Sequence, residues 1–266
     1  MIQHDQRRVI VTGGLSGIGY AIALDLAAKG HRVFLGARDV TSPNRVAALE
    51  TLSLASKALG GEVRAEVLDL TKQTSIDRFS ACAEDWFGIA DVLVNAAGVT
   101  AEQPVTGHSD ALWHEILDTN LTGAFRMIRA CLPAMIGQGW GRIVNIGSTA
   151  ATVGWKDNPA YCASKAGLLG LTRCVALEGA AHGVTCTMVS PTWVDTPMME
   201  SDLAEVVARE GRGRSTAEAR AEIAAQHPQG RIIQPEEIAA VVAFLIGDAA
   251  KGITMEEIKV TGGAHW

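Results

Sequence analysis

The sequence predicts an α/β fold built on one seven-stranded parallel sheet with helices on both faces. Short apolar runs alternate with stretches of helical pattern along the 266 residues, as in repeated strand–helix–strand units. A glycine-rich turn, Thr12 to Gly19, follows the first apolar run and opens the first helical stretch. The length fits one large domain, residues 1–266, and no linker or repeat divides it. We therefore expect a single-domain Rossmann fold.

Seven apolar runs are expected to form the strands of this sheet. In order they are Arg8–Val11, Arg32–Leu35, Glu62–Leu68, Asp91–Val94, Gly141–Ile146, Val184–Val189 and Glu257–Val260. The connecting segments carry helical patterns at Ile18–Lys29, Asn44–Leu59, Ser75–Phe87, Ala111–Ile136, Pro159–Ala181 and Pro235–Ile246. Between about residues 197 and 230 the chain is charged, alanine-rich and helical in pattern, without a strand. Such an excursion is typical of a lid over a substrate site, and a surface helical hairpin without a role is the alternative.

Composition favours a small-molecule substrate. The formal net charge of -6 argues against non-specific binding to nucleic acid or to an anionic membrane. The five cysteines have neither CxxC nor zinc-like spacing, so no metal site is expected. No window is apolar enough for a membrane helix, and the polar N-terminus lacks a signal-peptide core. A cytoplasmic location is the expectation.

The glycine-rich turn predicts a dinucleotide site at the end of the first strand. Gly13, Gly17 and Gly19 lie between a predicted strand and a predicted helix, the context that the dinucleotide fingerprint requires. Small residues let the backbone approach a pyrophosphate, which free N–H groups at a helix N-terminus stabilise. Asp69, after the third strand, is placed to accept from an adenine amino group, and Asn95 to Gly98 follow the fourth strand at the topological switch. A plain strand-to-helix turn is the alternative for the glycines alone.

The end of the second strand favours NADP(H), with NAD(H) as the alternative. An acidic residue there accepts from the ribose 2′-hydroxyl and repels a 2′-phosphate. Ala37 occupies the position expected for that acid, and Arg38 follows it as a candidate clamp for the phosphate. Asp39 would restore the acid if the register shifted by one place, and a strand-end arginine is often only a solvated charge.

Tyr161 and Lys165 predict proton-transfer chemistry coupled to a hydride from a cofactor. A phenol with a pKa of about 10 is a poor acid or base at neutral pH unless a neighbouring cation stabilises the phenolate. Residues four apart share a helix face, so Tyr161 and Lys165 would project into one site. Ser148, thirteen residues before Tyr161, supplies a second hydroxyl for the same oxygen.

Taken together, these motifs resemble the short-chain dehydrogenase/reductase superfamily over nearly the whole chain. The resemblance rests on the turn from Thr12 to Gly19, NAAG at Asn95–Gly98, YCASK at Tyr161–Lys165, and the single residues Asn120, Ser148, Pro191 and Thr196. It implies an NAD(P)-dependent oxidoreductase that interconverts a small carbonyl compound and its secondary alcohol.

The resemblance also implies a role for each catalytic residue. Tyr161 would be the general acid or base and Ser148 would polarise the substrate oxygen. Lys165 would lower the pKa of Tyr161 and bind the nicotinamide ribose, and Asn120 would help to anchor a water that relays protons to Lys165. Thr196 would bind the nicotinamide carboxamide. The expected cofactor-binding set is Gly13, Ser16, Gly17, Ile18, Gly19, Arg38, Asp69, Leu70, Asn95, Ala96, Gly98, Tyr161, Lys165, Pro191, Val194 and Thr196.

Within the superfamily, the segment from Pro191 to Met198 and the long lid are similar to 3-hydroxybutyrate dehydrogenases. Three residues that hold the substrate carboxylate there do not carry over, because Thr100, Ala150 and Asn158 occupy their positions, and only Trp193 is retained. A carboxylate without those donors loses several charge-assisted hydrogen bonds. A carboxylate substrate is therefore disfavoured, although Lys156 would compensate in part if the loop were arranged differently.

The chain is also similar to aromatic polyketide ketoreductases and acyl-carrier-protein reductases around Arg38 and from Asn120 to Gly123. The arginines through which the acyl-carrier enzymes dock their partner align with Pro133 and Leu177, and neither is basic. The negative charge of the chain also disfavours an acidic carrier. A free small carbonyl compound or secondary alcohol is the favoured substrate.

A mostly apolar pocket is expected to receive that substrate, although each of its residues also fits a packing role. Its expected lining is Thr149, Ala150, Trp155, Thr192, Trp193 and Met198. Thr192 replaces the usual glycine, which matters if that position requires positive φ. Four lid arginines, Arg209, Arg212, Arg214 and Arg220, are candidate anion ligands, but a solvated face that balances nearby glutamates is the favoured interpretation.

Three hypotheses follow, with an oxidoreductase first. A dinucleotide-sensing regulatory protein without turnover is the second, and the set of Asn120, Ser148, Tyr161 and Lys165 argues against it, since a sensor needs no tyrosine acid. An enzyme that uses the same fold for epimerisation or dehydration is the third. Relatives in the superfamily are commonly tetramers, so the resemblance implies a homotetramer through the helices at Ala111–Ile136 and Pro159–Ala181. The physiological substrate, the stereochemistry and the direction of the reaction stay open.

Overall fold

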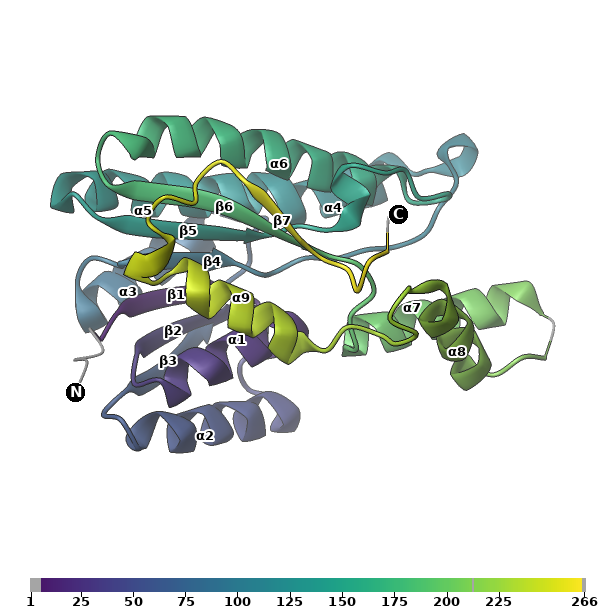
Figure 1. The fold of residues 1–266 in the computed structure, drawn as a ribbon, viewed down its shortest axis with the longest axis horizontal. Helices are drawn as coiled ribbons and strands as arrows, with labels where there is room; N and C mark the ends of the chain where they lie inside the picture. The colour runs from purple at the N-terminus through teal and green to yellow at the C-terminus, as the bar shows by residue number, and fades with distance from the viewer. Residues whose placement is uncertain (1–5, 212, 265–266) are drawn as a thin grey trace.

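A seven-stranded parallel sheet forms the centre of the computed structural model, which describes residues 6–211 and 213–264 (Figure 1). Its order is β3-β2-β1-β4-β5-β6-β7, and every neighbouring pair is parallel. The strands are β1 (Arg8–Thr12), β2 (Arg32–Ala37), β3 (Glu62–Val67), β4 (Val92–Asn95), β5 (Gly141–Ile146), β6 (Val184–Pro191) and β7 (Glu257–Val260). The α/β prediction is confirmed, and each expected strand forms within three residues of its expected ends.

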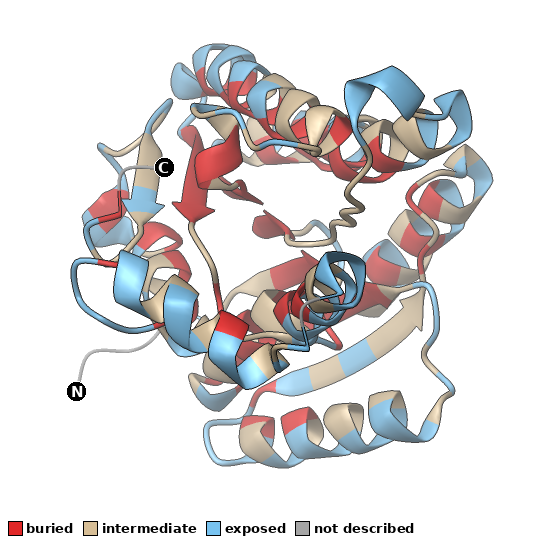
Figure 2. Cartoon of the chain, turned by 90° about the vertical axis from the view of Figure 1, so that its right-hand side faces the viewer, coloured by how far each residue is buried: buried red, intermediate tan, exposed pale blue. Residues whose placement is uncertain are grey.

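The helices cover both faces of the sheet. They are α1 (Gly17–Ala28), α2 (Pro43–Lys57), α3 (Gln73–Phe87), α4 (Asp110–Leu117), α5 (Gly123–Gln138), α6 (Pro159–Ala180), α7 (Pro197–Glu210), α8 (Thr216–Gln226) and α9 (Pro235–Leu245). Side chains from α1, α2 and α9 share one core with the sheet, and side chains from α3, α5 and α6 share the other. Val9 and Val11 of β1 enter the first core and Ile10 enters the second, because successive strand residues point to opposite faces. Figure 2 shows the buried residues gathered in the central strands and along the inner sides of the helices, while the edge strands β3 and β7 contain none.

The expected single helix at Ala111–Ile136 is wrong in one detail. A π-helical turn, Asp118–Thr122, separates α4 from α5. This wider turn contains Asn120, whose side chain is buried and hydrogen-bonds outside its own helix. One extra residue in a turn hardly changes an apolar pattern, so periodicity did not reveal it. Such bulges frequently occur at functional sites.

The segment after β6 forms the two helices α7 and α8 at the place where the sequence predicted a helical lid. Met199 and Leu203 of α7 pack with Ala219 of α8 and with Ile232, which follows α8, in a small apolar core separate from those of the sheet. Gly211 follows α7 in the left-handed conformation, which ends the helix. In Figure 1 the two helices project from the sheet at the end where β6 leads into α7. Within residues 6–211 and 213–264, no helix is both long and apolar enough to span a membrane.

Candidate active site

A cavity of about 1040 Å³ opens at the carboxyl edge of the sheet. Parallel strands all end at this edge, so loops that are distant in sequence meet there. Of the residues predicted to form the site, all except Asn95 and Asn120 line this cavity. The expected substrate-pocket residues Thr149, Ala150, Trp155, Thr192, Trp193 and Met198 are among them.

The glycine-rich turn after β1 forms a narrow cradle beside the loop after β4. Thr12 Oγ1 accepts hydrogen bonds from the backbone N–H groups of Ala96 and Ala97, each at 3.1 Å, and so holds the two loops together. A Cβ at Gly19 would lie 2.8 Å from the carbonyl carbon of Gly13, so a side chain there would force the turn apart. Gly13 itself has φ of +69°, a conformation that favours glycine.

The N-terminus of α1 faces this cradle with its backbone donors open. Ser16 is the N-cap residue, yet its side chain makes no capping hydrogen bond. Ser16, Gly17, Ile18 and Gly19 all line the cavity. The first N–H groups of a helix lack partners within the helix and attract anions. The cradle and the helix end therefore fit a pyrophosphate.

Two arginines, Arg38 and Arg45, line the cavity near the end of β2. The neighbouring carboxylate, Asp39, is hydrogen-bonded within its own turn. Arg38 is exposed, lines the cavity, and makes no hydrogen bond or ion pair within the part of the chain that the structure describes. Arg45, from the first turn of α2, lines the same region and donates to the carbonyl oxygen of Leu15. The carboxylate of Asp39 accepts from Thr41 N at 2.8 Å and from the Thr41 hydroxyl at 2.9 Å. Hydrogen bonds from Ser42 and Thr41, in that order of importance, hold its pKa below the usual range.

The loop after β3 places Asp69 at the cavity wall, with Leu70 beside it. Asp69 Oδ1 accepts from the Thr71 hydroxyl at 2.7 Å, and Oδ2 lies 3.0 Å from Lys72 Nζ. The Thr71 hydrogen bond is the main reason that the pKa of Asp69 is lowered. The ionised carboxylate is thus held at the position expected for an adenine acceptor.

Asn95 lies inside the protein and outside the cavity lining. Its amide nitrogen donates to Asn145 Oδ1 at 2.8 Å, and Asn145 in turn donates to the Thr172 hydroxyl at 2.9 Å. This buried chain of hydrogen bonds links β4, β5 and α6. Asn95 therefore supports the strands beneath the site, while its neighbours Ala96 and Gly98 lie at the surface of the cavity.

Tyr161, Ser148 and Lys165 converge at the floor of the cavity. Tyr161 and Lys165 lie in the first two turns of α6, and Lys165 Nζ is 5.5 Å from the centre of the tyrosine ring. Lys165 Nζ also donates to the carbonyl oxygen of Ile146 at 2.9 Å. Ser148, just after β5, accepts from Ala150 N at 3.1 Å, and its side chain is close enough to Tyr161 to affect the pKa of the phenol.

Burial dominates the electrostatics of these groups. It raises the pKa of Tyr161 to about 12, while the polar side chain of Ser148 opposes this rise. It lowers the pKa of Lys165 to about 8 because the buried ammonium loses hydration. At neutral pH the structure therefore favours a protonated phenol beside a lysine that is poised to lose its proton just above neutrality.

Asn120 lies behind these groups and anchors the loop after β4. Its amide oxygen accepts from Val99 N at 2.8 Å, and its amide nitrogen donates to Val99 O at 2.9 Å and to Ser164 Oγ at 3.1 Å. Both ends of the amide are thus engaged by the protein. The π-turn is what brings this side chain to the loop from the middle of a long helical segment.

The expected substrate pocket forms between the loop after β5 and the start of α7. The rings of Trp155 and Trp193 meet edge to face, with centroids 5.9 Å apart. Thr192 is half-buried and does not have positive φ, so its side chain is compatible with the backbone at the position where glycine is usual. Met198, from the first turn of α7, is partly exposed on the same cavity.

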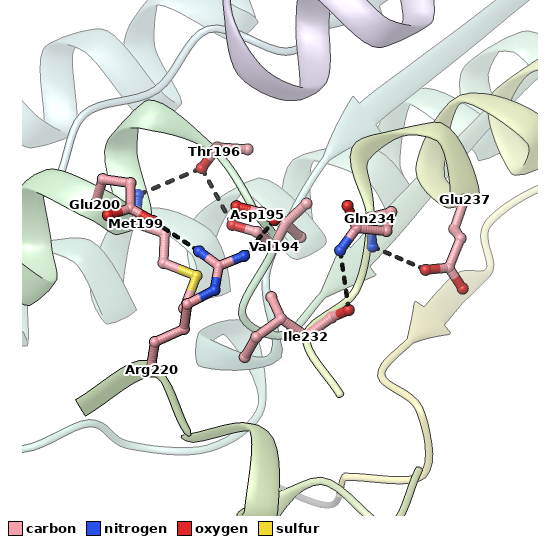
Figure 3. Close-up of polar contacts among 9 residues, drawn as sticks. All are labelled: Val194, Asp195, Thr196, Met199, Glu200, Arg220, Ile232, Gln234 and Glu237. Atoms are coloured by element: carbon pink, nitrogen blue, oxygen red, sulfur yellow. Dashed lines mark hydrogen bonds and ion pairs between the residues drawn. The ribbon is translucent and has the colours of Figure 1, made fainter. Parts of the chain in front are cut away.

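The loop after β6 is tied to the lid by an arginine (Figure 3). Arg220 of α8 pairs with Asp195 and, at 2.6 Å, with Glu200 of α7. Thr196 caps α7 by accepting from Met199 N at 3.3 Å, and its hydroxyl donates to Val194 O at 3.2 Å. Because Arg220 joins α8 to the loop after β6, a movement of the lid helices would also move this loop.

Two of the other lid arginines also pair with carboxylates. Arg209 pairs with Glu102, and Arg214 pairs with Glu210 and Glu222. The fourth, Arg212, lies outside the described residues. The three described arginines thus agree with the balanced charged face that the sequence favoured, rather than with an open anion site.

Sequence reasoning missed four charged residues at the cavity, Arg45, Glu102, Asp202 and Glu236. Arg45 lies seven residues after Arg38, and a search for a second cation near the end of β2 would have found it. Asp202 shares a face of α7 with Met198, four residues earlier, so helical spacing from that expected pocket residue pointed to it. Glu102 carried no comparable pattern.

Comparison with known proteins places this architecture among reductases. A family model described as enoyl-(acyl carrier protein) reductase matches residues 13–265. The chain is 36% identical to the 3-oxoacyl-(acyl-carrier-protein) reductase FabG of Escherichia coli strain K12, with 96% of each chain covered. It is 34% identical to the D-beta-hydroxybutyrate dehydrogenase of Rhizobium meliloti strain 1021, over 97% of this chain and 98% of that one. An actinorhodin polyketide ketoreductase variant solved with NADPH superposes with a TM-score of 0.89 at 37% identity, over 100% of this chain and 99% of that one.

A parallel sheet with this order, a glycine cradle and a hydroxyl pair at one cavity defines an oxidoreductase of the Rossmann class. The chain belongs to the short-chain dehydrogenase/reductase superfamily. The resemblance stated from its motifs is confirmed.

Proposed function

We propose that this protein, acting as one domain over its whole length, uses NADPH to reduce a small free ketone to its secondary alcohol. The carrying observation is that Ser148, Tyr161 and Lys165 share one cavity with the glycine cradle and with Arg38 and Arg45. Supporting it, the FabG and actinorhodin proteins are named as reductases, and the latter was solved with NADPH.

The proposed preference for NADPH rests on charge at the end of β2. Arg38 is free to pair with a 2′-phosphate, and Arg45 adds a second positive charge. Asp39 is engaged in its own turn and so competes poorly for a ribose 2′-hydroxyl. The other proposed contacts to the cofactor are made by the N-terminus of α1, by Asp69, and by the loops that contain Gly98 and Thr196.

In the proposed reaction Tyr161 donates a proton to the ketone oxygen, and Ser148 donates a hydrogen bond to that oxygen. The nicotinamide, when bound, supplies the hydride. The phenol of Tyr161 is protonated at neutral pH, so the proton needed for reduction is present, but its raised pKa makes it a weaker acid than a free phenol. Lowering that pKa is the role proposed for the ammonium of Lys165. Lys165 is proposed to hold the ribose and to return a proton toward Tyr161. Both ends of the Asn120 side-chain amide already make hydrogen bonds within the protein. The water that Asn120 is proposed to anchor would therefore bind to the backbone of this residue.

The pocket supports a free ketone more than a carboxylate or a carrier-bound acyl group. The residues Thr100, Ala150 and Asn158 supply no cation for a carboxylate. On the outer surface, Leu177 of α6 is a large exposed apolar residue rather than a basic one. Acidic carriers dock best on basic surfaces. The relative named for 3-oxoacyl-(acyl-carrier-protein) reduction makes the carrier-bound acyl group the second candidate.

Assembly is proposed to bury the outer faces of α5 and α6. Phe125 and Leu177 are exposed on these helices, with 42% and 68% of their surface accessible. Apolar patches of this kind often mark protein contacts. A homotetramer in the cytoplasm is the proposed state.

The test compares wild type with Tyr161→Phe and Arg38→Ala. Dissociation constants for NADPH and NADH are measured by fluorescence, and turnover is measured on neutral ketones and on a 3-oxoacyl carrier protein. We expect Tyr161→Phe to bind NADPH normally and to lose turnover, and Arg38→Ala to lose affinity for NADPH but not for NADH. Tight binding without turnover of any compound would favour the sensor alternative, and a product of unchanged oxidation state would favour an epimerase or dehydratase.

A further inference from the structure

An unpaired carboxyl group lies in the substrate half of the cavity. Asp202 projects from α7 on the same face as Met198 and Met199, and all three line the cavity with Tyr161. Asp202 is half-buried, and it makes no hydrogen bond or ion pair within residues 6–211 and 213–264. Its charge is close enough to Tyr161 to contribute to the raised pKa of the phenol.

The charges that act on Asp202 are negative, since Glu205 and Glu102 both repel a negative charge on its carboxyl group. Burial and these two acids raise the pKa of Asp202 to about 7. The cation on this side of the cavity is already engaged, because Arg209 pairs with Glu102, which also accepts from Asn158 at 3.5 Å.

The cations that line the cavity lie elsewhere. Within the described part of the chain they are Arg38 and Arg45 at the end of β2, and Lys165 on the floor beneath Tyr161. Neither the loop from Ser148 to Asn158 nor α7 contributes a described cation to the lining. A half-buried carboxyl group without a partner loses part of its hydration and gains nothing in exchange. A ligand that brings a positive charge would remove this cost, whereas an anionic ligand would increase it.

We propose that Asp202 is a specificity-determining residue that selects ketones bearing a protonated amine over neutral or carboxylate-bearing ketones of the same shape. The ammonium group of the substrate would lie between Asp202 and the tryptophan pair of Trp155 and Trp193, whose ring faces also attract cations. This proposal rests on the proposed ketone reduction, because it assigns the substrate class of the same cavity.

The test uses three ring ketones that differ in the charge of one substituent. The probes are 4-(dimethylamino)cyclohexanone, which is cationic at neutral pH, the neutral 4-isopropylcyclohexanone, and 4-oxocyclohexanecarboxylate. Both kcat/KM with NADPH and the dissociation constant from the NADPH-loaded protein are measured for each. The variants are Asp202→Asn, which keeps the shape of the side chain, and the control Glu205→Gln, which removes the same charge from an exposed position outside the lining.

In wild type we expect the amine to be preferred over its neutral analogue by about tenfold in both readouts, as a charge-assisted hydrogen bond would give, with the carboxylate weakest. Asp202→Asn should bring the ratio of amine to neutral ketone to about one, and Glu205→Gln should leave it within about twofold of wild type. Equal binding of all three ketones, binding of none, or a preference that survives Asp202→Asn would overturn the proposal.

The two readouts separate this proposal from the proposed reduction. Turnover of the neutral ketone without a charge preference would overturn the role of Asp202 and leave the reductase intact. A charge preference in the dissociation constants that Asp202→Asn abolishes, without turnover of any ketone, would support the role of Asp202 and count against ketone reduction.

Discussion

Replacing Lys165 with methionine should make the protein more stable at neutral pH, and this gain should vanish at high pH. Lys165 is only 5% exposed, and burial lowers its pKa from 10.5 to about 8. Since one pKa unit corresponds to about 1.4 kcal/mol, keeping the ammonium charged in the folded protein costs about 3 kcal/mol at neutral pH. Methionine removes this cost and fills a similar volume.

The pH dependence follows from the number of bound protons. Between about pH 8 and pH 10.5 the unfolded chain holds the lysine proton while the folded protein has lost it. Stability of the wild type therefore rises with pH across this window, relative to a variant without the lysine. At pH 7 the Lys165→Met protein should be more stable by about 2 kcal/mol, since the lost hydrogen bond to Ile146 offsets roughly 1 kcal/mol.

Urea unfolding of both proteins between pH 7 and pH 10.5 measures the difference in free energy of unfolding. Lys156→Met is the matched control, because Lys156 is exposed and lies on the loop before α6. Its difference from wild type should stay constant with pH. A Lys165→Met difference that stays equally constant, or that grows above pH 8, would refute the assignment of the lowered pKa to burial of this lysine.

Three further predictions concern the cradle, the lid and the assembly. Gly19→Ala should weaken NADPH binding by at least about tenfold in a fluorescence titration, because a Cβ there displaces the turn that approaches the pyrophosphate; unchanged affinity would contradict the cradle. Arg220→Met should change the free energy of unfolding by roughly 1 kcal/mol or less, yet speed limited proteolysis between α7 and α8, since it releases α8 from Asp195; an unchanged cleavage rate would contradict the coupling. Leu177→Glu should lower the mass measured by light scattering, since it places a charge on the exposed face of α6; an unchanged mass would exclude that face from the proposed assembly.

The strand positions were predictable because the central strands are short local runs of apolar residues, and the edge strands β3 and β7 alternate charged and apolar residues. The glycine turn and the Tyr161–Lys165 spacing were predictable for the same reason, since both depend on neighbours within one turn or one helix face. The π-turn around Asn120 was not, because one additional residue in a helical turn leaves the apolar pattern almost unchanged. Asn95 was expected at the cofactor, yet its partner is Asn145 on the adjacent strand, fifty residues away.

The sequence by itself determined the parallel α/β sheet, the turn after β1 and the chemical groups of the site, because these features depend on the periodicity and spacing of residues close together in the chain. Tertiary structure decided which groups share the cavity. It brought Arg45 of α2 into the same cavity lining as Arg38. It also placed Asp202 of the lid in the lining with Tyr161, where Asp202 makes no hydrogen bond or ion pair to any residue that the structure describes. These contacts depend on how α2 and α7 pack over strand ends that are distant in the chain, and such packing is set by the whole fold rather than by any one segment.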